Sequence, residues 1–143
     1  MAALQSSIDA LRLAAAAADR VKATDLVAFD VTGPIAITDA MLVATASSER
    51  QVLAVAEEIE KELYTKGGKL EARAREGLQE ARWVLLDYGD FVIHVMHQEE
   101  RSYYDLERLW KDCPRIDLQL PEAPEGSDAA AAGSADVAGE ESE

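Results

Sequence analysis

Two histidines and two glutamates close to the end of an apolar run are the first candidates for chemistry. His94 and His97 are three residues apart, and Glu99 and Glu100 follow closely. On a helix this spacing would place both imidazoles on one face, where they could bind Zn²⁺, whereas on a strand residues three apart point to opposite faces. The apolar run 91–96 predicts a strand. The sequence therefore predicts no metal site here, and His94 is either a core histidine or an exposed interface residue.

Three aspartates are candidates for carboxylate chemistry. Asp87 and Asp90 flank a predicted turn, and Asp30 lies near the end of an early apolar run. Metal-dependent nucleotidyl transfer needs two carboxylates side by side on one strand face, usually an Asp-x-Asp pair after a Gly-Ser loop. Here Tyr88 and Gly89 separate the pair, and no Gly-Ser loop precedes it. Turn formation accounts for both aspartates, although a nucleotidyltransferase with differently arranged metal ligands stays open as an alternative.

The thiol and hydroxyl nucleophiles lack the partners that catalysis requires. Cys113 is the only cysteine, so an intrachain disulfide is impossible, and the chain contains no G-x-S-x-G elbow. Ser47 and Ser48 precede a predicted helix, where Ser48 with Gln51 fits a capping box. The start of that helix could bind an anion, but no glycine-rich loop accompanies it. The sequence predicts a protein that is not an enzyme and needs no cofactor or metal.

These residues lie among elements that predict a mixed sheet of about five strands flanked by helices, an α/β (α+β) fold. Apolar spacing and turn residues set the expected boundaries. Strands are expected over 25–31, 40–46, 83–86 and 91–96, with a polar edge strand over 69–75. Helices are expected over 4–21, from 48 to about 66, and over 102–110, the last with an inner face of Tyr103, Leu106, Leu109 and Trp110. The run 40–46 is apolar on both faces, as in a central strand.

The C-terminal residues differ in charge and composition from the rest. Residues 121–143 hold seven carboxylates and no Lys or Arg, and the whole chain carries −14, so −14 minus −7 leaves −7 for residues 1–120. The Pro, Gly, Ala, Ser and Glu content of 121–143 predicts a disordered acidic tail. An acidic domain favours a basic protein partner and disfavours nucleic acid or an anionic membrane as the main contact.

No signal peptide and no apolar run of about 20 residues is evident. A cytoplasmic protein is therefore expected.

Several short motifs, taken in order and with their spacing, resemble the ribosomal silencing factor family (RsfS or Iojap) over about Asp25–Lys111. They are Asp30-Val31 with Gly33, ITDAM (37–41), ATASS (44–48) leading to RQV (50–52), Glu76-Gly77, WVLLDYGD (83–90), HVM (94–96) and YYDLERLW (103–110). On this basis residues 25–120 are expected to form a ribosomal silencing factor domain. Residues 1–24, which lie outside the resemblance, are expected to form an N-terminal amphipathic helix because of their apolar spacing. The resemblance implies a nucleotidyltransferase-like topology that lacks the catalytic metal-binding pair.

The resemblance also implies a partner and a mechanism. Members of the family bind the large ribosomal subunit through its protein uL14 and sterically block association with the small subunit, which lowers translation when nutrients are scarce. A homodimer is also implied as possible. A rival hypothesis from another class is an adaptor whose acidic tail recruits a different protein.

The docking surface is expected on the predicted hairpin and the helix after it. Trp83 is the expected apolar anchor, because Trp is enriched in binding hot spots. The other residues expected to contribute are Asp87, Tyr88, Asp90, His94, Met96, Glu99 and Arg101. The alternative to a docking role is that Trp83, Tyr103 and Trp110 are core residues, since the pattern does not reveal which face of the strand at 83–86 is covered.

Overall fold

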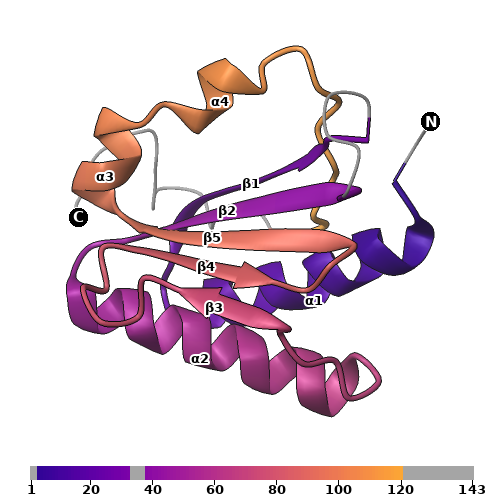
Figure 1. The fold of residues 1–143 in the computed structure, drawn as a ribbon, viewed down its shortest axis with the longest axis horizontal. Coiled ribbons are helices and arrows are strands. Elements are labelled where there is room, and N and C mark those ends of the chain that lie inside the picture. Colours follow the sequence, from indigo (N-terminus) through magenta and orange to yellow (C-terminus); the bar gives the residue numbers. More distant parts are fainter. Residues whose placement is uncertain (1–2, 33–37, 121–143) are drawn as a thin grey trace.

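The computed structural model describes residues 3–32 and 38–120. Within them, five strands form one sheet in the order β1-β2-β5-β4-β3 (Figure 1). The strands are β1 (Thr24–Asp30), β2 (Ala40–Ala46), β3 (Ala74–Glu76), β4 (Trp83–Asp87) and β5 (Phe91–His97). The helices are α1 (Gln5–Arg20), α2 (Glu49–Lys66), α3 (Gln98–Tyr103) and α4 (Leu106–Leu109). The predicted fold class, a mixed sheet flanked by helices, is confirmed.

The middle of the sheet is the parallel pair β2 and β5, and the other pairings are antiparallel. Every residue of β2 is buried, as its apolar character on both faces predicted. A parallel pair needs a long connection, and α2, β3 and β4 provide it. Ser48 begins α2 as predicted: its hydroxyl accepts a hydrogen bond from the Gln51 amide (3.1 Å), and the Gln51 side chain accepts one from the Ser47 amide (2.7 Å).

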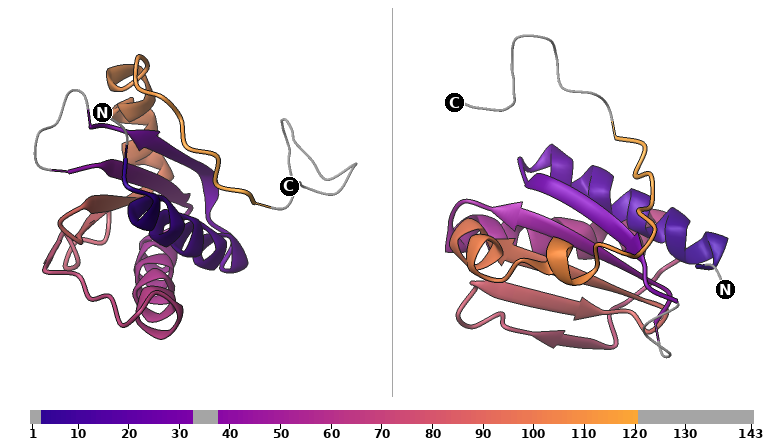
Figure 2. Two further views of the ribbon diagram at one scale, coloured as in Figure 1. Left: turned by 90° about the vertical axis from the view of Figure 1, so that its right-hand side faces the viewer. Right: turned by 90° about the horizontal axis from the view of Figure 1, so that it is seen from above.

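The two long helices cover one whole face of the sheet (Figure 2). The inner surface of α1 consists largely of buried alanines, with Leu11 among them, and small side chains let a helix approach its neighbours closely. Val52, Ile59 and Leu63 of α2 are fully buried in the same core. This core receives Val84 of β4 and the residues of β2 and β5 that point the same way.

The opposite face is covered only in part, by α3 and α4. Its core consists of β1, β2 and β5 side chains against which Leu106, Trp110 and Cys113 pack. The single helix expected over 102–110 is wrong. The His97 imidazole accepts a hydrogen bond from the Glu99 amide (3.1 Å) and begins α3 early, and Asp105 accepts one from the Arg108 amide (3.2 Å) and begins α4.

The break between α3 and α4 changes which side chains face inward. Tyr104 between them has an extended backbone, so the helical spacing does not continue across it. Tyr103 is 80% exposed and Leu109 is 65% exposed, so the sequence placed these two wrongly. Leu106 and Trp110 do pack inward as predicted.

The two edges of the sheet end differently. The expected edge strand 69–75 shrinks to the three residues of β3, which are all exposed. At the other edge, the Ile116 amide donates to the Ala28 carbonyl (2.9 Å) and the Asp30 amide to the Pro114 carbonyl (2.8 Å), so the segment after α4 pairs with β1. The acidic residues 121–143 that follow lie outside the described residues, and their predicted disorder stays a prediction.

Candidate functional site

Part of the second sheet face is left uncovered by α3 and α4. Trp83 and Leu85 of β4 and Val92 and His94 of β5 point to this side and are only half buried. They are called the open face below. Their neighbours Val84 and Ile93 point the other way and are fully buried under the long helices. The open face is therefore a largely apolar surface that residues 3–32 and 38–120 leave partly uncovered.

The Trp83 side chain is held from two sides. Its indole Nε1 donates a hydrogen bond to Nδ1 of His94 (2.9 Å). On another side its ring packs on Tyr104, with centroids 5.0 Å apart and ring planes tilted by 48°. Packed aromatic pairs of this kind add stability beyond the area they bury. Trp83 is thus a fixed part of the surface, and its orientation depends on both β5 and the α3–α4 junction.

The bond from Trp83 also determines the state of His94. An indole N–H can only donate, so Nδ1 of His94 must accept, and the proton of the neutral ring is on Nε2. Burial disfavours the charged form and lowers the pKa of His94 to about 4. At neutral pH the imidazole is uncharged and has one defined tautomer.

The two hairpin aspartates have different environments. Asp87 accepts a hydrogen bond from the Gly89 amide (2.8 Å) and forms an ion pair with Arg73 (3.3 Å), which is the turn-forming role that the sequence predicted. Gly89 has φ +86°, a conformation that favours glycine. Asp90 is exposed, and its carboxylate has no hydrogen bond or ion pair with another part of the described chain. Asp90 is thus the aspartate available to a cationic partner.

Three residues expected on the docking surface lie elsewhere. Met96 is fully buried in the core beneath α4. Tyr88 packs on the long-helix side, stacked on Phe91 with centroids 4.9 Å apart, and burial raises the pKa of its hydroxyl to about 12. Arg101 has a side chain only 9% exposed. These side chains are therefore not available on the open face, because neighbouring layers cover them.

Arg101 has a structural role instead. Its guanidinium donates to the Thr45 hydroxyl (2.5 Å) and to the Glu107 carboxylate (3.1 Å). Thr45 lies on β2 and Glu107 on α4. Arg101 therefore fastens α3 to the sheet and to α4, which keeps Tyr104 in position beside Trp83.

Glu99 lies at the start of α3 and takes part in an ion-pair cluster. Arg82, just before β4, pairs with Glu49 (2.9 Å), Glu99 (2.7 Å) and Glu100 (2.8 Å). These bonds raise the pKa of the Arg82 guanidinium and lower that of the Glu99 carboxyl. The Glu99 side chain is 70% exposed, so it remains accessible at the rim although it is already paired.

Residues that could bind a metal ion do not gather anywhere in ranges 3–32 and 38–120: no group of three or more His, Cys, Asp or Glu side chains has a suitable arrangement there. His94 lies on β5, as predicted, and His97, one residue beyond the predicted strand, is the last residue of β5 and is buried at the start of α3. No helix in these ranges is long and apolar enough to cross a membrane.

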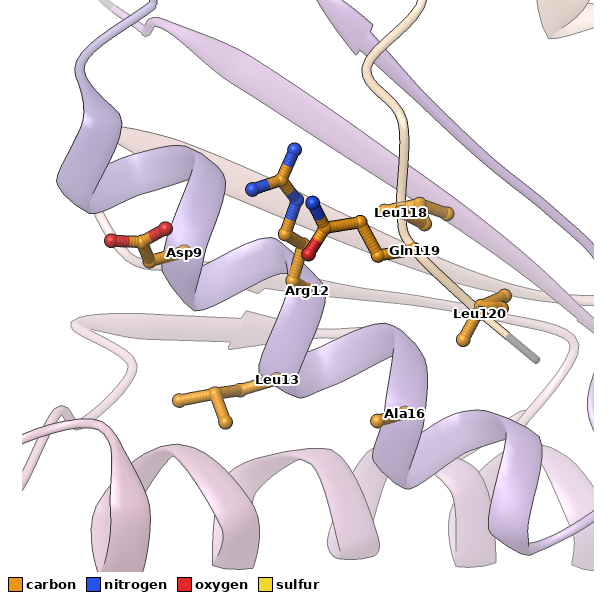
Figure 3. A pocket seen from close by; sticks show the side chains of 7 residues that line it. All are labelled: Asp9, Arg12, Leu13, Ala16, Leu118, Gln119 and Leu120. Atoms are coloured by element: carbon orange, nitrogen blue, oxygen red, sulfur yellow. The ribbon is translucent and has the colours of Figure 1, made fainter.

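A separate hollow of about 410 Å³ lies between α1 and the segment after α4 (Figure 3). Leu13, Ala16, Leu118 and Leu120 line it together with Asp9, Arg12 and Gln119. Arg12 Nε donates to the carbonyl oxygen of Asp117 (2.9 Å) and ties the segment to the helix. The hollow lies on the side of the long helices, apart from the open face.

Sequence reasoning missed three contributors to the site. Leu85 and Val92 could have been found, because each lies two residues from a predicted site residue on the same strand. Leu85 therefore shares a face with Trp83, and Val92 shares a face with His94. Tyr104 could not have been found, because its place beside Trp83 depends on the helix break that follows α3.

Comparisons with known proteins identify relatives of this chain by sequence and by fold. The family model described as "Ribosomal silencing factor during starvation" matches residues 4–142. A Bacillus subtilis protein named ribosomal silencing factor RsfS is 45% identical over 110 residues, covering 77% of this chain and 92% of the relative. The chloroplastic protein Iojap of Arabidopsis thaliana is 33% identical over 109 residues, covering 76% of this chain and 44% of the relative.

Two crystal structures are similar in fold. One, from Bacillus halodurans, has a TM-score of 0.65 and 41% sequence identity, covering 76% of this chain and 97% of that chain. The other, from Chromobacterium violaceum, has a TM-score of 0.67 and 36% identity, covering 72% and 84% respectively.

Proposed function

This chain belongs to the ribosomal silencing factor family, and on that premise we propose that it represses translation by binding the large ribosomal subunit through ribosomal protein uL14. The bound protein would occupy space that the small subunit needs, so the two subunits could not join. The repression would act when nutrients are limiting, and in the cytoplasm. The mechanism is steric, so it requires a docking surface and no catalytic group.

The observation that carries the proposal is the open face. Trp83, Leu85, Val92 and His94 form a largely apolar patch that the helices leave partly exposed. An aromatic anchor among apolar neighbours is the typical composition of a binding hot spot. Because Trp83 is already fixed by His94 and Tyr104, little side-chain freedom would be lost on binding.

The charge around the open face supports a basic partner. Asp90 at the hairpin turn presents a carboxylate that has no ion pair with residues 3–32 or 38–120, and residues 1–120 carry a net charge of −7. An acidic surface attracts a basic protein and speeds their encounter. We propose that Asp90 receives a Lys or Arg of the partner while Trp83 fills an apolar pocket.

Sedimentation of purified ribosomal subunits tests the proposal. With magnesium raised to promote subunit joining, the wild-type protein should travel with the large subunit and reduce the joined peak. Trp83→Ala should weaken binding about 30-fold, which corresponds to about 2 kcal/mol for the loss of an anchor. Asp90→Lys should weaken it mainly at low salt.

Matched controls come from α2 on the opposite side of the sheet. Tyr64 and Glu57 are exposed there, so Tyr64→Ala and Glu57→Lys should bind as the wild type does. The docking surface is wrong if Trp83→Ala and Asp90→Lys, each shown to be folded, also bind like the wild type.

Two measurements separate the rival functions. Metal-dependent nucleotide binding by the purified protein would favour the nucleotidyltransferase hypothesis. Loss of ribosome binding after deletion of residues 121–143 would favour the acidic-tail adaptor, whereas the silencing mechanism predicts that binding survives. A homodimer formed through the open face would compete with the ribosome by mass action, so subunit binding should then rise less steeply with total protein concentration than it would for a monomer.

A further inference from the structure

His94 has one hydrogen-bonding group that its surroundings do not use. Its Nδ1 accepts from Trp83, which leaves Nε2–H as the free donor. Nε2 has no hydrogen-bond partner within residues 3–32 and 38–120. It is also not among the side-chain atoms that are buried without a partner there, which belong to Ser7, Thr38 and Tyr88. The Nε2–H of His94 therefore reaches the surface of the open face.

We propose that His94 is a specificity-determining residue, which donates its Nε2–H to an oxygen acceptor on the protein partner. This inference rests on the proposed function, because it concerns the same docking surface. The acceptor would be a backbone carbonyl or a side-chain carbonyl or carboxylate oxygen set in an apolar surface. A Lys or Arg placed over His94 would meet a donor with another donor and would be rejected.

The surroundings of His94 favour this role. Leu85 lies directly opposite on β4, and Val92 lies two residues away on β5, so apolar side chains surround the donor. Water would be displaced from them on binding, and a hydrogen bond is stronger where water is excluded. An acceptor facing a missing donor would then carry its full desolvation cost.

The donor is also fixed in place before binding. The Trp83 indole blocks Nδ1 and excludes the other tautomer, and Tyr104 supports the far side of the indole. In the register of the hairpin, His94 lies opposite Leu85 on β4, and the available carboxylate of Asp90 lies at the hairpin turn, four residues before His94 in the sequence. The partner should match this pattern with an acceptor over His94 and a cation near the hairpin turn.

Two substitutions at one position separate donation from packing. His94→Gln retains an N–H donor in a side chain of similar length, whereas His94→Leu keeps an apolar side chain and removes the donor. Affinity for purified large subunits should fall about 10- to 100-fold for His94→Leu, the loss expected when a buried acceptor is left unpaired. His94→Gln should stay within about threefold of the wild type.

The tautomer is measured independently on the whole protein by ¹⁵N NMR of the imidazole. The wild type should show a protonated Nε2 and an unprotonated Nδ1 at pH 7. Trp83→Phe keeps the ring but removes the indole donor, so it should allow both tautomers. Circular dichroism and urea unfolding establish that each variant is folded before its affinity is measured.

Each result bears on the inference. Equal binding by the wild type and His94→Leu would overturn it, as would equal weakening by both substitutions, which indicates packing alone. A wild-type ring protonated on Nδ1 would also overturn it. Failure of the wild type itself to bind the large subunit would refute the proposed function and the partner assignment with it. This result is distinguishable from a failure of the His94 inference, because it is seen before any variant is compared.

Discussion

Acid should destabilise this protein through His94 at pH values where its carboxylates are still largely ionised. In the folded chain, burial lowers the pKa of His94 to about 4, whereas an unfolded histidine titrates near 6.5. Between these values the unfolded chain binds more protons than the folded chain. The contribution of His94 to stability is therefore fully present above about pH 6.5, is lost as the pH falls, and stops changing below about pH 4.

The size of the effect follows from the two pKa values. Lowering the pH from 7 to 5 should cost about 2 kcal/mol of unfolding free energy through this one residue. Urea unfolding at a series of pH values, followed by Trp fluorescence and circular dichroism, would measure it. His94→Gln provides the control, because it removes the titrating group and retains His97 and all carboxylates.

The comparison between the two proteins is what tests the reasoning. The wild-type curve should fall more steeply than the His94→Gln curve between pH 6.5 and 5, and the curves should run parallel below about pH 4. Parallel curves throughout would mean that His94 titrates normally when folded. The Trp83 hydrogen bond would then not hold the ring in a buried, neutral state, and the description of the open face would need revision.

Two further substitutions should affect the supports of the open face. Gly77→Ala should destabilise the fold by at least about 2 kcal/mol, because φ is +83° and a Cβ would lie 2.0 Å from the carbonyl oxygen of Trp83. Gly68→Ala is the control, since Gly68 has φ +82° with open space around it. This control should lower the free energy of unfolding by only about 1 kcal/mol in the same urea experiment. Arg101→Met should lower the free energy of unfolding by about 1 to 3 kcal/mol, because the Thr45 hydroxyl loses its donor. It should also weaken large-subunit binding, because the α3–α4 junction is misplaced. Unchanged stability and binding would contradict the role of Arg101.

Local patterns were enough to predict most of the sheet. β2 needed only its apolar run, and β4 and β5 needed only alternation around a turn containing Gly89. These elements are predictable because the side-chain period and the turn residues are properties of neighbouring positions. β3 was placed too early and too long, because an exposed three-residue edge strand leaves almost no hydrophobic signal.

The side of the sheet on which each residue lies was harder to predict. Trp83 and Tyr88 are both aromatic and five residues apart, so their positions on opposite faces followed from alternation, but not which face would be covered. A usable signal was the position of the polar groups: Asp87 and His94 share the face of Trp83, whereas Val84 and Ile93 on the other face are aliphatic. A face without charged side chains is the one that a helix layer covers most favourably.

The residues misassigned to the docking surface share a different cause. Arg101 looks like a surface cation in the sequence, and its burial depends on Thr45, which lies 56 residues away. Met96 alternates with His94 and was expected beside it, but it lies in the core against which Leu106 and Trp110 pack. Both outcomes were set by where α3 and α4 settle, and that depends on the Tyr104 break rather than on any periodic pattern.

The unequal length of the helices explains why the open face exists. α1 and α2 have 16 and 18 residues and α3 and α4 have 6 and 4, so at about 1.5 Å per residue the second pair is far too short to span five strands. It covers β1, β2 and part of β5 and leaves the outer side of β4 half exposed. An additional helix over β4 would bury that apolar surface and stabilise the isolated domain while removing the proposed docking site. The partly uncovered strand leaves apolar surface in contact with water, which costs stability, and the proposed partner would cover that surface.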